Sequence, residues 1–342
     1  MKNSGLLIIS GWILLLASCS ELTADTPSPT LPCDTLPSVV HEKTEVAKPK
    51  KPLTAKDVTL EVALLFDKYT LEDTYPYEKT QRNFKWEHIH EILAHIENMQ
   101  EDKRRWVVLQ NYKNMNREAP LVKKYVRNKY HRVADTLGVE RYQSVPLYTP
   151  QDTLTPIIYG RDGSIAHLAQ TTKNFYRIVS HIDQKEWYVP RRYVKMLPDT
   201  VKFRKVIFVD RKDQNITTLE WAERGKWLVR SKNPATTGRN KPPYAQPTPL
   251  GIFLIQEQKR KMFYLKDGSK EHGGFAPYAS RFTNGAYIHG VPVNAPHTKE
   301  IEYSWSLGTT PRSHMCVRNA TSHAKFIYQW APLRNSLVVV IE

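Results

Sequence analysis

The stretch that decides the fold is Arg312-Ser313-His314-Met315-Cys316-Val317-Arg318. Only the thiolate form of cysteine is a strong nucleophile, so a reactive Cys316 needs a base beside it. The tetrahedral intermediate of acyl transfer also needs N–H donors around its oxyanion. The candidate base is His289, in Ile288-His289-Gly290, which lies 27 positions upstream. Only a folded chain could bring the two side chains together.

The chain around these two residues is rich in short apolar runs. Such runs, separated by turn residues, predict strands. They lie at 206–209, 219–221, 227–229, 250–255 and 337–341, and the last is typical of a buried strand. We therefore expect a mainly β domain over residues 202–342.

Four sequence elements in this domain occur in a fixed order. They are Val209-Asp210 at a strand end, Thr248-Pro249-x-Gly251-x-Phe253, Ile288-His289-Gly290, and Ser313-His314-x-Cys316-Val317-Arg318. Taken together, this order resembles the L,D-transpeptidase (YkuD-type) catalytic domain of bacterial cell-wall enzymes. The resemblance implies a peptidoglycan transpeptidase that acts on tetrapeptide stems through a cysteine thioester, releases D-alanine and forms 3→3 cross-links. It implies no cofactor and no metal, and it implies acylation of the cysteine by carbapenems.

The resemblance also implies roles for individual residues. Cys316 would be the nucleophile and His289 its base, and the backbone carbonyl of Gly290 would orient the imidazole. The backbone N–H groups of Cys316 and Met315, with His314 as a third candidate, would form the oxyanion hole.

Other residues of the site have more than one reading. Ser313 and His314 would order the loop around the thiol. Arg318 would either pair with a substrate carboxylate or brace the site by a charge-assisted hydrogen bond. Tyr278 and Trp305 are aromatic candidates for the substrate cleft, with core or surface packing as the alternative.

Met315 departs from the family pattern, which usually has glycine at this position. A methionine would be strained if the position requires a positive φ, but it keeps the backbone N–H. Met315 is also the sole sequence support for an alternative of another class, a non-catalytic wall-binding lipoprotein. The loop between His289 and Cys316 is longer than is usual in the family, which favours an inserted lid or a specificity loop over the site.

The N-terminus predicts an exported lipoprotein. Lys2 precedes an apolar run over 6–17, shorter than the roughly 20 residues that span a bilayer. Leu16-Ala17-Ser18-Cys19 resembles the lipobox, so we expect a signal peptide over 1–18 and a lipid anchor on Cys19. Because Asp is absent at position 20, we expect a periplasmic protein attached to the outer membrane.

Charge and cysteine content narrow the classes of partner. The formal net charge is +16, which favours an anionic partner. Export excludes nucleic acid, so the expected partners are the carboxylate-bearing stem peptides of peptidoglycan, and the membrane through Cys19. Three cysteines exclude a disulfide-dense scaffold and a Cys-rich metal site.

Three further segments precede the catalytic domain. A Pro- and Lys-rich tether is expected over 19–53, with Cys33 inside it and without an assigned role. Residues 54–135 are expected to be helical, because Val58, Val62, Leu65 and Tyr69 recur at helical spacing, as do Ile89, Leu93, Ile96 and Met99. The run 106–109 fits a helix or a strand. The spacing of His88, His90 and His95 does not fit a zinc helix.

Residues 141–198 contain short β-like runs that predict a small barrel. Its end, Trp187-Tyr188-Val189-Pro190, resembles that of bacterial Src-homology-3-like domains. Such a barrel would bind peptidoglycan or act as a spacer.

The sequence leaves the acceptor of the reaction open. A second stem, water, a free D-amino acid and the lysine of a lipoprotein all fit the same cysteine chemistry. The first would give a transpeptidase, and water would give an L,D-carboxypeptidase or endopeptidase. No oligomeric state is predicted.

Overall fold

The structure, a computed structural model, describes residues 51–122, 126–127, 133–134, 141–181 and 183–342. The predicted signal peptide over 1–18, Cys19, Cys33 and the tether up to residue 50 lie outside the described residues. Among the helices of the described part, none has the length and apolar character needed to cross a membrane.

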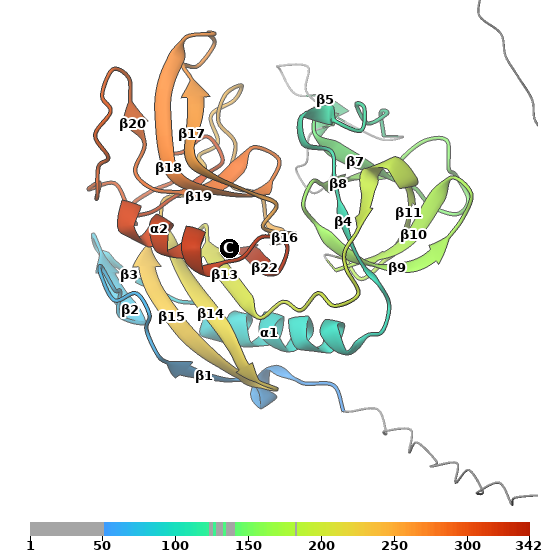
Figure 1. Cartoon of the computed structure of the whole chain (residues 1–342), viewed down its shortest axis with the longest axis horizontal. Coiled ribbons are helices and arrows are strands. Elements are labelled where there is room, and N and C mark those ends of the chain that lie inside the picture. Colours follow the sequence, from blue (N-terminus) through green and yellow to red (C-terminus); the bar gives the residue numbers. More distant parts are fainter. Residues whose placement is uncertain (1–50, 123–125, 128–132, 135–140, 182) are drawn as a thin grey trace, which may run out of the picture. The chain divides into compact units, whose positions relative to one another are not determined.

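The region that is predicted to be catalytic is built on a six-stranded sheet (Figure 1). In order across the sheet, its strands are β1 (Thr59–Val62), β15 (Lys226–Pro234), β14 (Asn215–Glu223), β13 (Lys205–Asp210), β22 (Ser336–Ile341) and β16 (Gly251–Leu254). The β1–β15 and β13–β22 pairs are parallel, and the other pairs are antiparallel. The chain therefore ends on a strand beside the centre of the sheet, as the apolar run over 337–341 predicts.

Alternate residues of the central strands enter two different cores, because successive side chains of a strand point to opposite faces. Val206 and Phe208 of β13 pack with the buried face of α1 (Trp86–Glu101), which carries Ile89, Leu93 and Ile96. The intervening residues of β13, Ile207 and Val209, face the opposite way. Figure 1 shows α1 along one face of the sheet.

The opposite face packs against a second sheet and α2 (Thr321–Trp330). The second sheet runs β17 (Glu257–Leu265), β18 (His272–Thr283), β19 (Ala286–His289) and β21 (Val317–Arg318), with β20 (Val293–Asn294) paired to β18. Because β19 and β21 are parallel and in register, His289 lies opposite Arg318. This pairing brings the histidine strand to the cysteine loop.

The prediction of a helical segment over 54–135 is wrong for most of its length. Only α1 confirms it, and the other elements among its described residues are short strands and two 3-10 helices. These elements are η1 (Ala55–Asp57), β1, β2 (Thr74–Tyr77), β3 (Thr80–Asn83), β4 (Trp106–Leu109), η2 (Tyr112–Asn114), β5 (Val126–Arg127) and β6 (Val133–Ala134). Val62 and Leu65 are 60% and 57% exposed, so their helical spacing marks no buried face.

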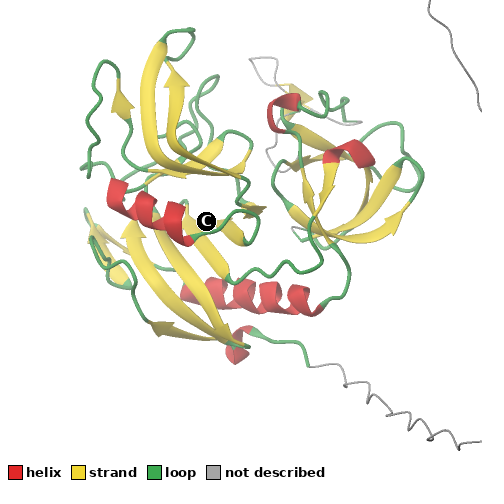
Figure 2. Ribbon diagram, viewed as in Figure 1, coloured by secondary structure: helices red, strands yellow, loops and turns green. Residues whose placement is uncertain are grey.

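Residues 141–198 form strands where the apolar runs predict them (Figure 2). The strands are β7 (Ser144–Leu147), β8 (Ile158–Arg161), β9 (Ile165–Thr171), β10 (Phe175–Ser180), β11 (Glu186–Pro190) and β12 (Val194–Met196), with η3 (Arg191–Tyr193) between the last two. Five strands pair in the order β11-β10-β9-β4-β12, and β7 and β8 form a hairpin. The sheet order of the described strands is open, so the predicted closed barrel is not confirmed.

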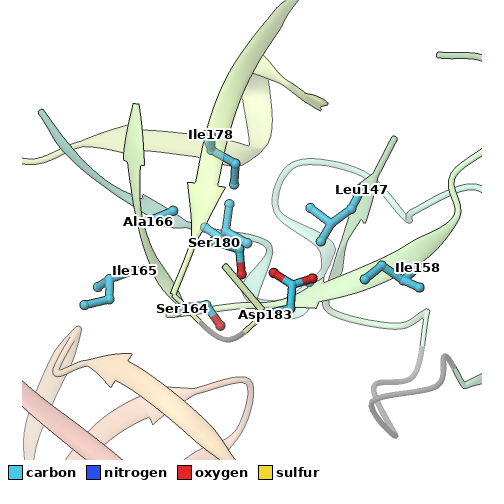
Figure 3. Close-up of a pocket in the computed structure, with 10 residues that line it drawn as sticks. Leu147, Ile158, Ser164, Ile165, Ala166, Ile178, Ser180 and Asp183 are labelled. Carbon is cyan, nitrogen blue, oxygen red and sulfur yellow. The ribbon is translucent and has the colours of Figure 1, made fainter. Parts of the chain in front are cut away.

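This smaller sheet takes β4 from outside the predicted range. Val107 and Val108 of β4 are fully buried, and β4 pairs with both β9 and β12. Leu147, Ile178 and Ala166 border a small cavity of about 20 Å³ in its core (Figure 3). That volume is close to the space of one water molecule, so the cavity is a packing defect rather than a ligand site.

Candidate active site

A cavity of about 980 Å³ opens over the end of the second sheet. Its walls come from β17, β18, the loop after β19 and the loop before β21. Six of the residues singled out in the sequence line it: His289, Trp305, Ser313, His314, Cys316 and Arg318. The fold therefore places on one cavity the cysteine and the histidine that the sequence separates by 27 positions.

His289 is buried at the end of β19, and one hydrogen bond orients its ring. The Nδ1 atom lies 2.6 Å from the carbonyl oxygen of Gly290, so Nδ1 carries the proton and donates it. This tautomer leaves Nε2 as an acceptor. Burial lowers the pKa of His289 to about 4, opposed by the Gly290 hydrogen bond and assisted by the charge of Arg318. The imidazole is therefore neutral at pH 7 and can accept a proton.

Gly290 is required by the packing around it. A Cβ atom at this position would lie 2.7 Å from the Thr321 hydroxyl and 2.9 Å from the Pro277 ring. The start of α2 therefore reaches the histidine strand only because residue 290 has no side chain.

Cys316 is half-buried, and its Sγ lies 3.6 Å from the carbonyl oxygen of Gly285. Burial raises the pKa of the thiol, and the backbone N–H of Tyr287 and the charge of Arg318 oppose that rise. With His289 neutral, the resting pair is a thiol and an imidazole rather than an ion pair.

Hydrogen bonds within the signature hold the cysteine loop. The Ser313 hydroxyl donates to the carbonyl oxygen of Cys316 and accepts from the backbone N–H of Met315 at 3.3 Å. Thr248 secures the same loop from outside, since its hydroxyl donates to the Met315 carbonyl at 2.8 Å. That hydroxyl also accepts from the Gly238 N–H, at 2.8 Å.

A neighbouring segment pairs with the signature on both sides of Cys316. Thr236 and Arg318 exchange two backbone hydrogen bonds of 2.9 Å, and the Arg239 N–H donates to the Ser313 carbonyl at 3.0 Å. A Cβ atom on Gly238 would lie 2.2 Å from the Gln246 carbonyl oxygen and 2.7 Å from the Met315 Cα. Sequence reasoning missed Gly238, because no motif in Thr236-Thr237-Gly238-Arg239 indicates that Gln246 and Met315 approach the glycine so closely.

Met315 does not adopt a positive φ, unlike 11 other non-glycine residues of the described chain. A side chain at this position is therefore free of the backbone strain that the family's usual glycine suggested. Its N–H, one of the three oxyanion candidates, is directed at the Ser313 hydroxyl in this structure.

Arg318 projects a cation into the cavity. Its guanidinium forms no ion pair with any described carboxylate, and its buried Nε has no hydrogen-bond partner among the described residues. Burial lowers the pKa of the group. A half-buried cation without an acidic neighbour is an electrostatic site for an anionic ligand.

The remaining predicted residues differ in position. Nε2 of His314 lies 2.9 Å from Asp267 Oδ2, on the turn between β17 and β18, so His314 contacts the cavity wall rather than the thiol. Trp305 is 76% exposed at the cavity mouth, with the Arg312 guanidinium 4.7 Å from its ring centre. The structure does not bring Tyr278 into the cleft, because its ring packs against Tyr328 and Arg260 instead.

Several cavity residues were missed by sequence reasoning. They are mostly apolar or aromatic and come from strands and loops outside the motifs. Examples are Tyr244, Met262, Tyr264, Ile301 and Tyr303. The alternation Met262-x-Tyr264 on β17 is the one local signal that could have indicated a side facing a cleft.

Among the side chains that the structure describes, no group of three or more His, Cys, Asp or Glu residues could hold a metal ion. His88 contacts Glu91 at 3.1 Å, and His95 lies 3.3 Å from the Gln184 amide nitrogen.

Comparisons with known proteins follow this geometry. Residues 204–341 match the family model of the L,D-transpeptidase catalytic domain, YkuD. A comparison with curated proteins gave no match.

The solved structures to which the chain is similar include three bacterial proteins, each at low sequence identity. A fused Zn-dependent amidase/peptidase/peptidoglycan-binding protein from Clostridium acetobutylicum is 18% identical, over 40% of this chain and 52% of that one, with a TM-score of 0.29. An L,D-transpeptidase from Mycobacterium smegmatis is 17% identical, over 52% and 82%, with a TM-score of 0.33.

The third, an L,D-transpeptidase from Mycobacterium tuberculosis H37Rv, is 21% identical, over 52% and 77%, with a TM-score of 0.32. The chain thus spans about half the length of the Clostridium protein. The family match covers all four sequence elements, from the end of β13 to the cysteine loop. Residues 204–341 are therefore an L,D-transpeptidase catalytic domain of the YkuD family.

Proposed function

We propose that the protein is a peptidoglycan L,D-transpeptidase that forms 3→3 cross-links through a thioester on Cys316. The observation that carries the proposal is the hydrogen bond from Nδ1 of His289 to the Gly290 carbonyl, in the same cavity as Cys316. It leaves a neutral acceptor nitrogen on a base that lines the cavity together with a thiol. A backbone carbonyl here takes the orienting role that a carboxylate has in a Ser-His-Asp triad.

In the acylation step, Sγ of Cys316 attacks the carbonyl carbon between residue three and the terminal D-alanine of a tetrapeptide stem. Nε2 of His289 takes the thiol proton and then gives it to the nitrogen of the leaving D-alanine. The C–N bond breaks, and a thioester on Cys316 remains. The backbone N–H groups of Cys316 and His314 are the candidates to stabilise the oxyanion, because the Met315 N–H is directed at Ser313.

In the second step, an amine of another stem attacks the thioester and loses its proton to His289. The thiol is regenerated and the cross-link forms. The cavity of about 980 Å³ is at the upper end of the range of about 300–1,000 Å³ for small-molecule sites. That size supports an amine acceptor as the second peptide, in preference to water alone.

Arg318 supports a carboxylate-bearing donor. A substrate carboxylate beside its guanidinium would supply the anion that the described residues lack. Stem peptides carry such carboxylates, so the same cation would bind the substrate and keep His289 unprotonated.

The location of the enzyme belongs to the same proposal. The lipobox-like Leu16-Ala17-Ser18-Cys19 supports a lipid on Cys19, a periplasmic position and attachment to the outer membrane. The net charge of +16 supports attraction to the acidic wall polymer.

The test is incubation of the purified full-length protein with disaccharide-tetrapeptide, followed by mass spectrometry of the products. We expect free D-alanine and a cross-linked dimer, and neither product from Cys316→Ala. A hydrolysed tripeptide without dimer would instead identify a carboxypeptidase. Dimer formation by Cys316→Ala would refute the cysteine mechanism.

A further inference from the structure

One wall of the cavity is a loop that follows β20. We call residues 301–309 the rim loop. Ile301, Tyr303 and Trp305 of this loop line the cavity together with Met262 and Tyr264 of β17. The loop lies within residues 204–341, which match the catalytic domain. Each residue that holds the loop therefore belongs either to the domain or to the chain before it.

Part of the support comes from the catalytic domain itself. The Thr236 hydroxyl donates to the Ser306 carbonyl at 2.7 Å, and the Thr321 hydroxyl donates to the Ile301 carbonyl at 2.6 Å. These two hydrogen bonds hold the backbone of the loop at Ile301 and at Ser306. Its outer side is contacted by residues that precede the domain by more than a hundred positions.

Three side chains of the leading segment (residues 54–84) contact that outer side. Nζ of Lys68 lies 2.9 Å from the Glu302 carboxylate. The Tyr69 and Tyr303 rings are 4.5 Å apart between centres. The Arg82 guanidinium donates to two backbone carbonyls of the rim loop, those of Gly308 and Thr309. We call Lys68, Tyr69 and Arg82 the clamp residues.

Tyr69 is held in a conformation that a tyrosine rarely adopts. Its φ is 58°, in the left-handed region that favours glycine. The Asn233 amide nitrogen donates to the carbonyls of Lys68 and Tyr69, at 2.7 and 3.2 Å, and keeps the turn in place. The ring also packs on a small core that contains Leu307 of the rim loop. The backbone strain is therefore tolerated at the position that places an aromatic ring against the cavity wall.

The three contacts differ in expected strength. The Lys68–Glu302 pair is half-exposed and contributes little. The Tyr69–Tyr303 pair adds aromatic contact area. Arg82 contributes most, because its charged donors satisfy two loop carbonyls in a part-buried position.

We propose that Lys68, Tyr69 and Arg82 are positioning residues that hold the rim loop as a preformed wall of the stem-peptide site. Resting on the proposed function, this assigns the leading segment a role in substrate affinity, while the thiol chemistry stays with the catalytic domain. A preformed wall spares the substrate the cost of ordering it, which lowers KM.

The experiment compares Arg82→Gln, Arg82→Lys and Tyr69→Gly with Arg105→Gln in the full-length protein. Tyr69→Gly removes the ring and relieves the positive φ. Arg105 pairs with Asp199, and neither lines the cavity, so Arg105→Gln is the matched control. Four quantities are measured: KM and kcat for disaccharide-tetrapeptide, the rate of Cys316 alkylation by iodoacetamide, and hydrogen exchange of the rim-loop amides.

We expect Arg82→Gln to raise KM about tenfold, because two carbonyls of the rim loop lose a charged hydrogen-bond donor. Rim-loop exchange should become faster in Arg82→Gln and Tyr69→Gly, with iodoacetamide alkylation unchanged. Arg82→Lys should recover part of the KM, and Arg105→Gln should behave as wild type.

An unchanged KM in Arg82→Gln, or rim-loop exchange equal to wild type, would overturn the inference. So would a kcat loss that runs in parallel with slower alkylation, because the effect would then lie on the thiol. If the wild-type protein releases no D-alanine, the proposed function has failed, and the exchange measurement still decides whether the clamp residues hold the loop.

Discussion

The floor of the cavity and its rim are held in different ways. At the floor, Cys316 is flanked by backbone pairs to Thr236 and Arg239, and buried hydroxyls of Ser313 and Thr248 brace it. At the rim, the loop over 301–309 is held in part by a half-exposed ion pair, a tilted contact between two tyrosine rings and one arginine, all from residues before the domain. The floor is built within residues 204–341, and the rim is completed from outside them.

This difference separates chemistry from substrate selection. The hydrogen bonds that hold the residues that would react come from within residues 204–341. The wall that would meet the rest of the substrate depends on chain elements that other proteins with this domain need not share. Changes at the floor should therefore lower kcat or stability, and changes at the rim should act on KM.

Loss of the base has the largest expected effect. His289→Gln should lower kcat for disaccharide-tetrapeptide by about 10²–10⁴-fold, because Nε2 would no longer take the thiol proton. Steady-state release of D-alanine measures this. If Tyr69→Gly at the rim lowered kcat as much, the separation of floor and rim would fail.

Thiol reactivity should depend steeply on pH. The pKa of Cys316 is raised by burial and that of His289 is lowered to about 4, so both groups are neutral between pH 5 and 8. Alkylation by iodoacetamide should then rise about tenfold per pH unit through neutrality, as the small thiolate fraction grows. An alkylation rate that is already constant at pH 6–8 would indicate a thiolate–imidazolium pair. It would contradict the neutral Cys316 thiol and the neutral His289 imidazole that we predict.

Removal of one buried hydroxyl should affect stability moderately. Thr248→Val leaves the Met315 carbonyl and the Gly238 N–H without their partner, which costs about 1–3 kcal/mol for each buried group. Thr309→Val is the rim counterpart, since its hydroxyl donates to the Ser306 carbonyl in a part-buried position. Denaturant unfolding should show a larger loss of unfolding free energy for Thr248→Val than for Thr309→Val. Equal losses would contradict the difference between floor and rim.

The smallest effect is expected at Met315. Because Met315 is not at a positive φ, the family's usual glycine offers no relief of strain there. Met315→Gly should retain turnover and lose up to about 1 kcal/mol of stability through added freedom of the unfolded chain. A large gain in kcat in Met315→Gly would show that the methionine side chain hinders the reaction at Cys316.

The sequence predicted the catalytic strands well because each is a short apolar run whose alternate residues are buried on two faces. It failed over 54–135 because helical spacing is a local signal, whereas β1 is formed by its pairing with β15. The residues Thr59 and Lys226 of that pair are far apart in the chain. The run at 106–109 was ambiguous for the same reason, since β9 and β12 decide it.

The site was predictable to the extent that its residues lie in motifs. Cys316 and His289, which line the cavity, were singled out in this way, whereas Thr248 lies in a motif but had no predicted role. Tyr69 and Tyr303 meet across more than two hundred residues, and neither lies in a motif, so no spacing could indicate the contact. Tyr278 was chosen as an aromatic of the domain, but its strand turns it toward Tyr328.

The most direct test of the central claim is the intact mass of the full-length protein, measured seconds after mixing with disaccharide-tetrapeptide, followed by mapping of the modified peptide. The account predicts a covalent adduct on Cys316 whose mass is that of the substrate minus D-alanine, and no adduct on Cys316→Ala. Release of D-alanine with the adduct on another residue, or an equal adduct on Cys316→Ala, would contradict it.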